Sequence, residues 1–302
     1  MRKRVVVTGY GMVSPIGLSA KESYKNAING VSGIDKITKF DASSFEVKIA
    51  AEVKGFNPEN YVEKKEVKKY DLFSLYALAA AQEAIEHSGL DLEKLDLFRC
   101  GVSVGSGIGG LGTIEKYEQV LMQRGYKGVS PFFIPTAVIN MAGGNIAIKY
   151  RLKGPNYATV TACASAAHAI GFAARNIMYG DADVMIAGGC ESTITPLAIA
   201  GFQNMKALST RNDEPQKSSR PFDLKRDGFI IGEGAGILVL EEYEFAKKRN
   251  ANILAELVGF GMSDDGYHIT APDPEGKGAI YAMQMALNDA RLNPESIDYI
   301  NA

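Results

Sequence analysis

The sequence has little of several residue types that carry specialised structure. It contains no tryptophan, three histidines and three cysteines among 302 residues. An odd and small number of cysteines is not a disulfide framework, and no Cys/His spacing suits a zinc ion. Lys and Arg number 33 against 35 Asp and Glu, so charge gives no reason to expect nucleic acid. We therefore expect no metal and no nucleic acid partner.

Long apolar runs are missing as well. After the basic start at residues 1–4, Val5 to Val7 is too short for the apolar core of a secretory signal. The uncharged stretch 128–148 is interrupted by prolines, glycines and asparagines, which is typical of buried core and not of a membrane helix. The sequence thus predicts a cytoplasmic chain that does not contact membranes and keeps its cysteines reduced.

Glycine is in excess, at 32 residues, and short apolar runs alternate with helical periodicity. This alternation favours an α/β fold, and the length allows two domain-sized units without a linker between them. Helices are predicted at 19–30, 71–88 and 164–179, the first opened by a capping box at Ser19 to Glu22. Strands are predicted at 4–8, 101–104, 157–161, 182–187 and 229–240.

An internal repeat is the most informative pattern. Residues 77–96 and 279–298, at an offset of 202, share seven identical positions in twenty. The glycine pair in Gly9-Tyr10-Gly11-Met12 recurs in Gly259-Phe260-Gly261-Met262. Because both echoes occur in the same order, we predict two related halves, the second ending inside a strand near residues 299–301.

Cys163 differs from the other two cysteines in its predicted position. It stands at the junction of the strand 157–161 and the helix 164–179, where the helix dipole and free backbone N–H groups favour a thiolate. Cys100 and Cys190 are expected to be buried. His168 is a poor base for Cys163, because five residues turn a helix by about 140° from the start. From the residues alone, Cys163 is either a nucleophile or a small buried side chain.

Two glycine motifs compete with this interpretation. Gly101 to Gly105 matches G-x-S-x-G, but Ser103 lies inside an alternating strand pattern, so we treat the match as accidental. Gly105 to Gly110 matches G-x-G-x-x-G after a strand, which is typical of dinucleotide binding. No helix follows at once and no acidic residue ends a second strand, so this stays the second hypothesis.

Lysines are concentrated in Lys64-Lys65-Glu66-Val67-Lys68-Lys69. At helical spacing Lys65, Lys68 and Lys69 share one face. That face is either an ordinary solvated surface or a docking patch for an acidic partner.

The segment around Cys163 resembles the nucleophile signature of the β-ketoacyl-[acyl-carrier-protein] synthases, and the whole chain is similar to the elongating type II enzymes of bacterial fatty acid synthesis. The resemblance rests on these segments: Val6-Val7-Thr8-Gly9, Gly105 to Gly110, Gly154-Pro155-Asn156-Tyr157, Thr161 to Gly171, Pro221 to Phe229 and Gly232-Glu233-Gly234-Ala235-Gly236. It implies the thiolase-like fold, five α/β/α/β/α layers in two similar halves. Residues 1–250 would form the first half, and 251–302 the start of an incomplete second half.

The resemblance also implies an activity and its residues. Cys163 would take an acyl chain from the phosphopantetheine arm of acyl carrier protein, and condensation with malonyl carrier protein would follow with loss of CO₂. The Cys163 N–H would serve the oxyanion hole. Further matches are acyl-pocket positions Ile108, Phe133 and Phe202, entrance-loop positions His268 and Thr270, and carrier-protein docking positions Lys65, Lys68, Lys69, Lys127 and Lys206. The resemblance implies no cofactor, and it implies that the protein forms a homodimer.

One departure from the family pattern concerns the groups that assist decarboxylation. The family carries two catalytic histidines and a lysine further along than Ala302, so the resemblance implies that this chain is incomplete and inactive alone. The alternative is a non-catalytic partner of the same fold that binds acyl groups or carrier protein.

Overall fold

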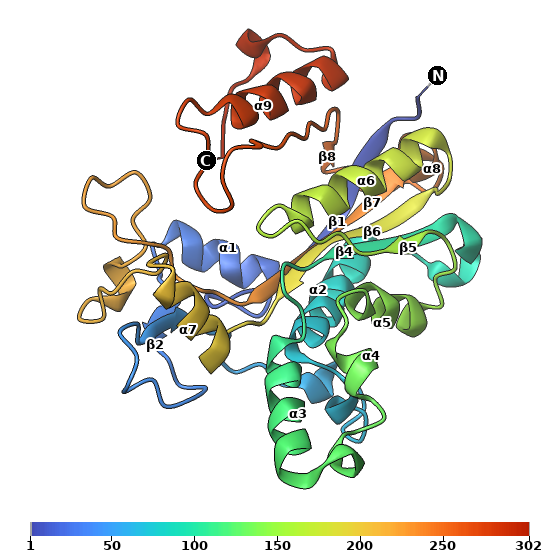
Figure 1. Ribbon diagram of the computed structural model, residues 1–302. Coiled ribbons are helices and arrows are strands. Elements are labelled where there is room, and N and C mark those ends of the chain that lie inside the picture. The colour runs from blue at the N-terminus through green and yellow to red at the C-terminus, as the bar shows by residue number, and fades with distance from the viewer. Residues whose placement is uncertain (1, 302) are drawn as a thin grey trace.

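The computed structural model describes residues 2–301, and its centre is one mixed sheet of six strands (Figure 1). The strand order is β5-β4-β6-β7-β1-β8, in which β4, β5 and β6 are parallel and β7 is antiparallel to β6 and β1. The strands are β1 (Val5–Val13), β4 (Cys100–Gly105), β5 (Asn156–Tyr157), β6 (Val184–Glu191), β7 (Gly234–Glu242) and β8 (Ala255–Glu256). A separate pair joins β2 (Ile34–Lys36) to β3 (Ile49–Ala51).

Helices cover both faces of this sheet. On one face α2 (Leu72–Ser88) packs against β1, β6 and β7, and α5 (Met141–Tyr150) against β4. On the other face α6 (Ser165–Tyr179) packs against β4 and β6 (Figure 1). The remaining helices are α1 (Ala20–Ile28), α3 (Leu111–Arg124), α4 (Phe133–Ala137), α7 (Pro196–Asn204), α8 (Tyr243–Lys248) and α9 (Lys277–Ala290). Because β4 is buried along its whole length, the core lies between these layers.

The helix ends follow the sequence signals. Ser19 caps α1, with its hydroxyl oxygen accepting from the Glu22 N–H at 3.2 Å. Asp71 caps α2 in the same way, and Gly89 ends that helix with a left-handed φ of 63°. All three predicted helices, which are α1, α2 and α6, are confirmed with ends within two residues of the prediction.

Several predicted strand limits are wrong, and glycine explains two of them. β1 continues past Gly9 to Val13, and β6 continues through Gly188 and Gly189. These glycines stay in the strands because neighbouring backbone lies where a Cβ would stand, that of α2 at Gly9 and of β7 at Gly188. A glycine pair therefore marks close packing here and not a strand end.

Other expectations also need correction. Of the predicted strand 157–161, only Tyr157 joins the sheet, where it forms the short strand β5 together with Asn156. β7 begins at Gly234 and not at residue 229. Residues 299–301 form no strand, because no described segment lies alongside to pair with them. The lysine segment is a set of turns with a 3₁₀ helix at Val67–Lys69, not an α-helix.

The internal repeat is visible as repeated packing. Helices α2 and α9 correspond at the offset of 202, as do the 3₁₀ helices Leu92–Lys94 and Pro294–Ser296. Gly9 and Gly11 lie against the carbonyls of Ala84 and Ala80, and Gly259 and Gly261 lie against those of Ala286 and Ala282. The alanines are again related by the offset of 202, whereas the glycines are 250 residues apart. The two segments thus repeat one helix-on-glycine contact. In Figure 1 the second copy, with α9, lies outside the layers of the main sheet.

Two kinds of feature are absent from residues 2–301. None of the helices there combines the length and apolar character needed to cross a membrane. No cluster of three or more His, Cys, Asp or Glu side chains in the same range is arranged to hold a metal ion.

Candidate active site

Cys163 is exposed on a tight turn that connects β5 to α6, and it is the exposed one of the three free cysteines. The turn requires a left-handed backbone at Ala162, where φ is +50°. Ala164 N–H then donates to the Thr161 carbonyl and Ser165 N–H to the Ala162 carbonyl, both at 3.1 Å. A non-glycine residue in this region costs free energy, so the surroundings must hold the turn.

Ser165 holds the turn from inside. Its buried hydroxyl accepts from the Thr161 N–H at 2.8 Å and donates to the Ala162 carbonyl at 2.7 Å. Thr159 adds a third connection, because its hydroxyl donates to the Ser165 carbonyl at 2.7 Å. The residues on either side of the strained position are therefore fixed to the first turn of α6, and Cys163 is carried outward between them.

Glycines bring this first turn close to the sheet. A Cβ on Gly105, at the end of β4, would lie 2.5 Å from the Ser165 carbonyl oxygen. A Cβ on Gly189 of β6 would lie 2.5 Å from the Ala166 Cβ. Both distances are shorter than contacts between carbon or oxygen atoms allow, so the α6 N-terminus needs glycine at both positions.

The Cys163 backbone N–H donates no hydrogen bond to any of residues 2–301. It stands one residue before the cap of α6, where free N–H groups and the helix dipole favour negative charge. The two other thiols differ. Burial, with a smaller effect of nearby carboxylates, raises the pKa of Cys100 to about 12 and raises the pKa of Cys190 well above its usual value. Only Cys163 is placed to react with a dissolved substrate.

The histidines are not partners of the thiol within the described residues. His168 Nδ1 lies 2.8 Å from the Thr161 hydroxyl oxygen, and its ring packs against Phe172 and Phe260. His87 packs on Tyr10 with ring centroids 4.3 Å apart. His168 therefore contacts Thr161 and the aromatic rings and does not bond Cys163 Sγ, as the helical spacing predicted.

The glycine-rich loop that follows β4 is already occupied by a carboxylate. Glu191 Oε2 accepts from the N–H groups of Gly107 at 2.7 Å and Ile108 at 3.1 Å. Its Oε1 accepts from Gly109 N–H at 3.0 Å and from the Ser106 hydroxyl at 2.9 Å. These are the donors that would hold a dinucleotide phosphate. The second hypothesis from the sequence is therefore wrong, because an internal anion already satisfies the loop.

The G-x-S-x-G match is confirmed as accidental. Ser103 is fully buried in the middle of β4, so its hydroxyl does not reach solvent or substrate.

The three expected acyl-pocket residues come from three separate elements. Ile108 is on the glycine-rich loop and is 37% exposed. Phe133 begins α4, with its ring 5.3 Å from that of Tyr117 on α3. Phe202 is on α7 and packs 5.5 Å from Phe229.

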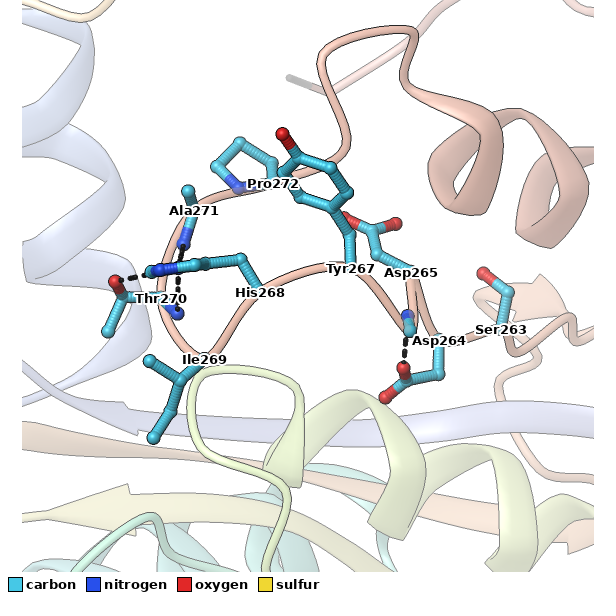
Figure 2. A pocket seen from close by; sticks show the side chains of 10 residues that line it. Ser263, Asp264, Asp265, Tyr267, His268, Ile269, Thr270, Ala271 and Pro272 are labelled. Atoms are coloured by element: carbon cyan, nitrogen blue, oxygen red, sulfur yellow. Dashed lines mark hydrogen bonds between the residues drawn. The ribbon is translucent and has the colours of Figure 1, made fainter.

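The expected entrance loop forms a hollow of its own (Figure 2). Residues Ser263 to Pro272 alone line this open volume of about 690 Å³. His268 Nδ1 accepts from the N–H groups of Thr270 and Ala271, each at 3.1 Å, so its ring is directed into its own loop. Cys163 is not part of this hollow, which we therefore do not take as the active site.

The docking lysines fall into two groups. Lys65 pairs with Glu63 at 2.8 Å, Lys69 with Glu66 at 2.6 Å and Lys206 with Glu46 at 3.1 Å. Lys68 and Lys127 are exposed and form no ion pair within residues 2–301. Nearby carboxylates thus balance three of the five predicted docking lysines, and Lys68 and Lys127 carry the unbalanced positive charge.

A mixed sheet covered on both faces, with one exposed thiol at a helix N-terminus, is the arrangement of the thiolase-like condensing enzymes. The chain belongs to the β-ketoacyl synthase family: the model of the N-terminal domain matches residues 2–246 and that of the C-terminal domain residues 254–302.

Curated relatives agree over the whole chain. It is 53% identical over 301 residues to the 3-oxoacyl-[acyl-carrier-protein] synthase 2 of Vibrio cholerae, and 53% identical to that of Coxiella burnetii. The match covers 100% of this chain and 73% of each of these relatives. The expected family and enzyme class, an acyltransferase of the condensing type, are confirmed.

Solved structures confirm the expected fold class. A β-ketoacyl synthase from Burkholderia phymatum has a TM-score of 0.91 at 37% identity, covering 99% of this chain and 73% of that one. A type II polyketide synthase ketosynthase, solved in complex with its acyl carrier protein and bound to the hexaketide, has a TM-score of 0.87 at 33% identity and covers 100% and 73%.

Sequence reasoning missed Ser165 and Glu191. A signal for Ser165 existed, because a serine two residues after a candidate nucleophile at a helix start can bond the preceding turn. Glu191 had no local signal, since 82 to 85 residues separate it from its partners in the loop.

We expect Ser165→Ala to destabilise the protein by about 1–3 kcal/mol, because one hydroxyl satisfies two backbone groups at the strained turn. Urea unfolding measures this change, and iodoacetamide should then modify Cys163 at an altered rate. Ser74→Ala is the matched control. Its buried hydroxyl has no hydrogen-bond partner within residues 2–301, so removing it should not lower the free energy of unfolding and should leave the rate of Cys163 modification unchanged. Equal behaviour of the two variants would contradict the role of Ser165.

Proposed function

We propose that this chain accepts an acyl group on Cys163 Sγ from the phosphopantetheine thioester of acyl carrier protein. The observation that carries the proposal is the placement of the one exposed thiol at the N-terminus of α6. The Cys163 thiolate attacks the thioester carbonyl, the acyl–Sγ bond forms, the bond from the acyl carbon to the phosphopantetheine sulfur breaks, and that sulfur leaves as its thiolate. The Cys163 N–H, which donates to no protein acceptor among residues 2–301, supplies one oxyanion-hole donor.

The second half-reaction is condensation with malonyl carrier protein. Loss of CO₂ leaves an enolate carbon that attacks the Cys163 thioester, which releases the thiolate and a 3-oxoacyl chain two carbons longer. Both relatives named above are 3-oxoacyl-[acyl-carrier-protein] synthases, which supports this chemistry. Residues 2–301 supply the nucleophile for it. Neither reaction calls for a cofactor beyond the phosphopantetheine that carries the substrates.

The acyl pocket is proposed to be formed by Ile108, Phe133 and Phe202, with His268 and Thr270 on a loop at its entrance. Support for Ile108 comes from its loop, which contacts the nucleophile turn: a Cβ on Gly107 would lie 3.4 Å from the Ala162 carbonyl oxygen. We further propose that residues 1–250 and 251–302 belong to successive thiolase-like halves. The limits of the two family models support that division.

Acyl carrier protein is the proposed partner, and the proposed setting is a cytoplasmic homodimer. The structural neighbour solved with its own carrier protein supports the first of these. An acidic carrier would meet the basic surface at Lys68 and Lys127, with Lys65, Lys69 and Lys206 beside it after exchange of their local partners.

We expect Cys163→Ala to lower acyl transfer by about 10³-fold or more, because no other exposed thiol is available. Intact mass spectrometry after incubation with acyl-loaded carrier protein measures the acyl adduct. Cys190→Ala is the control and should keep the adduct, since that thiol is buried. Acylation of Cys163→Ala would overturn the proposal. An acylated protein that yields no 3-oxo product would still agree with the proposed acyl transfer, because residues 2–301 supply the nucleophile and the resemblance places the groups that assist decarboxylation further along.

Docking should depend most on the two lysines without a local acid. We expect Lys68→Glu combined with Lys127→Glu to raise the carrier-protein KM about tenfold at low salt, and less at high salt because the interaction is screened. Lys65→Glu should have a smaller effect, since Glu63 already offsets that charge. Lys94→Glu is a distant control, because Lys94 follows the opposite end of α2, about 25 Å along the helix. Equal effects of all three changes would argue against a docking site.

A further inference from the structure

Glu191 is a charged residue close to the nucleophile turn, and the proposed reaction does not use its carboxylate. It ends β6, where its backbone is paired with Gly234 of β7, so its position is fixed by the sheet. Its two oxygens accept four hydrogen bonds of 2.7–3.1 Å from Ser106, Gly107, Ile108 and Gly109. Such contacts to an ionised acceptor are stronger than neutral ones. The loop is therefore anchored by a single side chain.

We propose that Glu191 is a positioning residue, which holds the glycine-rich loop against the nucleophile turn and thereby sets how long an acyl chain Cys163 accepts. The inference rests on the proposed function and deepens it. Glu191 does not touch the reacting atoms. It acts through the loop, whose Ile108 is the proposed pocket residue.

Gly107 connects the carboxylate to the turn. A Cβ at this position would lie 2.9 Å from Glu191 Oε2 on one side and 3.4 Å from the Ala162 carbonyl oxygen on the other. The loop is thus confined between Glu191 and the residue that precedes Cys163. Because Ile108 follows Gly107 directly, a displacement of the loop at Gly107 moves Ile108 relative to the thiol.

Glutamine at 191 tests the anchor with little change in volume. A carboxamide offers one oxygen, so the donors on its other side would face an NH₂ group, which is also a donor. Repulsion between these donors should release part of the loop. Reaction of a long chain then suffers more than that of a short chain, because only the long chain needs the far wall of the pocket.

Glu52→Gln is the matched control. Glu52 likewise anchors a loop through its carboxylate, accepting from the N–H groups of Thr38 at 2.8 Å and Lys39 at 3.2 Å. Its loop belongs to the β2–β3 side of the molecule, not to the nucleophile turn. Both variants lose the same kind of interaction, so a general loss of stability affects them alike.

The experiment compares acylation of the full chain by carrier protein loaded with a six-carbon or a sixteen-carbon chain, followed by intact mass. For Glu191→Gln we expect the ratio of long-chain to short-chain rates to fall about tenfold, and for Glu52→Gln no change in the ratio. Gly107→Ala, which pushes the loop without removing the carboxylate, should shift the ratio in the same direction. An unchanged ratio in both loop variants, or an equal shift in Glu52→Gln, would overturn the inference.

Amide hydrogen exchange over residues 105–110 separates this inference from the proposed function. We expect Glu191→Gln to speed exchange there about tenfold, with exchange around residues 38–39 unchanged. If carrier protein loaded with either chain fails to acylate the wild-type protein, the proposed function fails. Hydrogen exchange then still decides whether Glu191 holds the loop. Unchanged exchange over residues 105–110 would refute that anchor.

Discussion

The close contact between the first turn of α6 and the sheet is the constraint on which the site depends. Gly105 and Gly189 have no Cβ, and the space each Cβ would take is filled by Ser165 and Ala166. With the helix start pressed onto β4 and β6, the chain that arrives from β5 has room only for a tight turn. The left-handed Ala162 and the outward position of Cys163 follow from that shortage of space.

Two polar side chains stabilise the tight turn at Cys163 and the glycine-rich loop beside it. Ser165 bonds the backbone on both sides of Ala162, and Glu191 bonds the loop that lies against the same residue. Both use side chains from regular elements to fix irregular backbone, which is how a rigid scaffold carries a reactive loop. Together they give partners to the Thr161 N–H and the Ala162 carbonyl of the turn and to three N–H groups of the glycine-rich loop.

The sequence predicted the features that depend on local chemistry. The cap at Ser19, the position of Cys163 before a helix, and the repeat at offset 202 all belong to this group. Prediction from the sequence was wrong where contacts with distant segments determine the local structure. Gly188 and Gly189 were interpreted as a strand end, although β7 and α6 require them inside a strand. The sequence gives no signal for Glu191, because its partners lie 82 to 85 residues away. The loop N–H groups that Glu191 satisfies are the same donors that a phosphate would use, and for this reason the G-x-G-x-x-G pattern predicted a phosphate site.

The most direct test of the central claim, that the fold presents Cys163 and buries its two other thiols, is a comparison of cysteine modification rates in the native state. Limited iodoacetamide treatment followed by peptide mapping should modify Cys163 first. Cys100 and Cys190 should react only after unfolding, because burial shields both thiols and raises their pKa values. Equal native-state modification of all three cysteines would contradict this arrangement of the fold and the site.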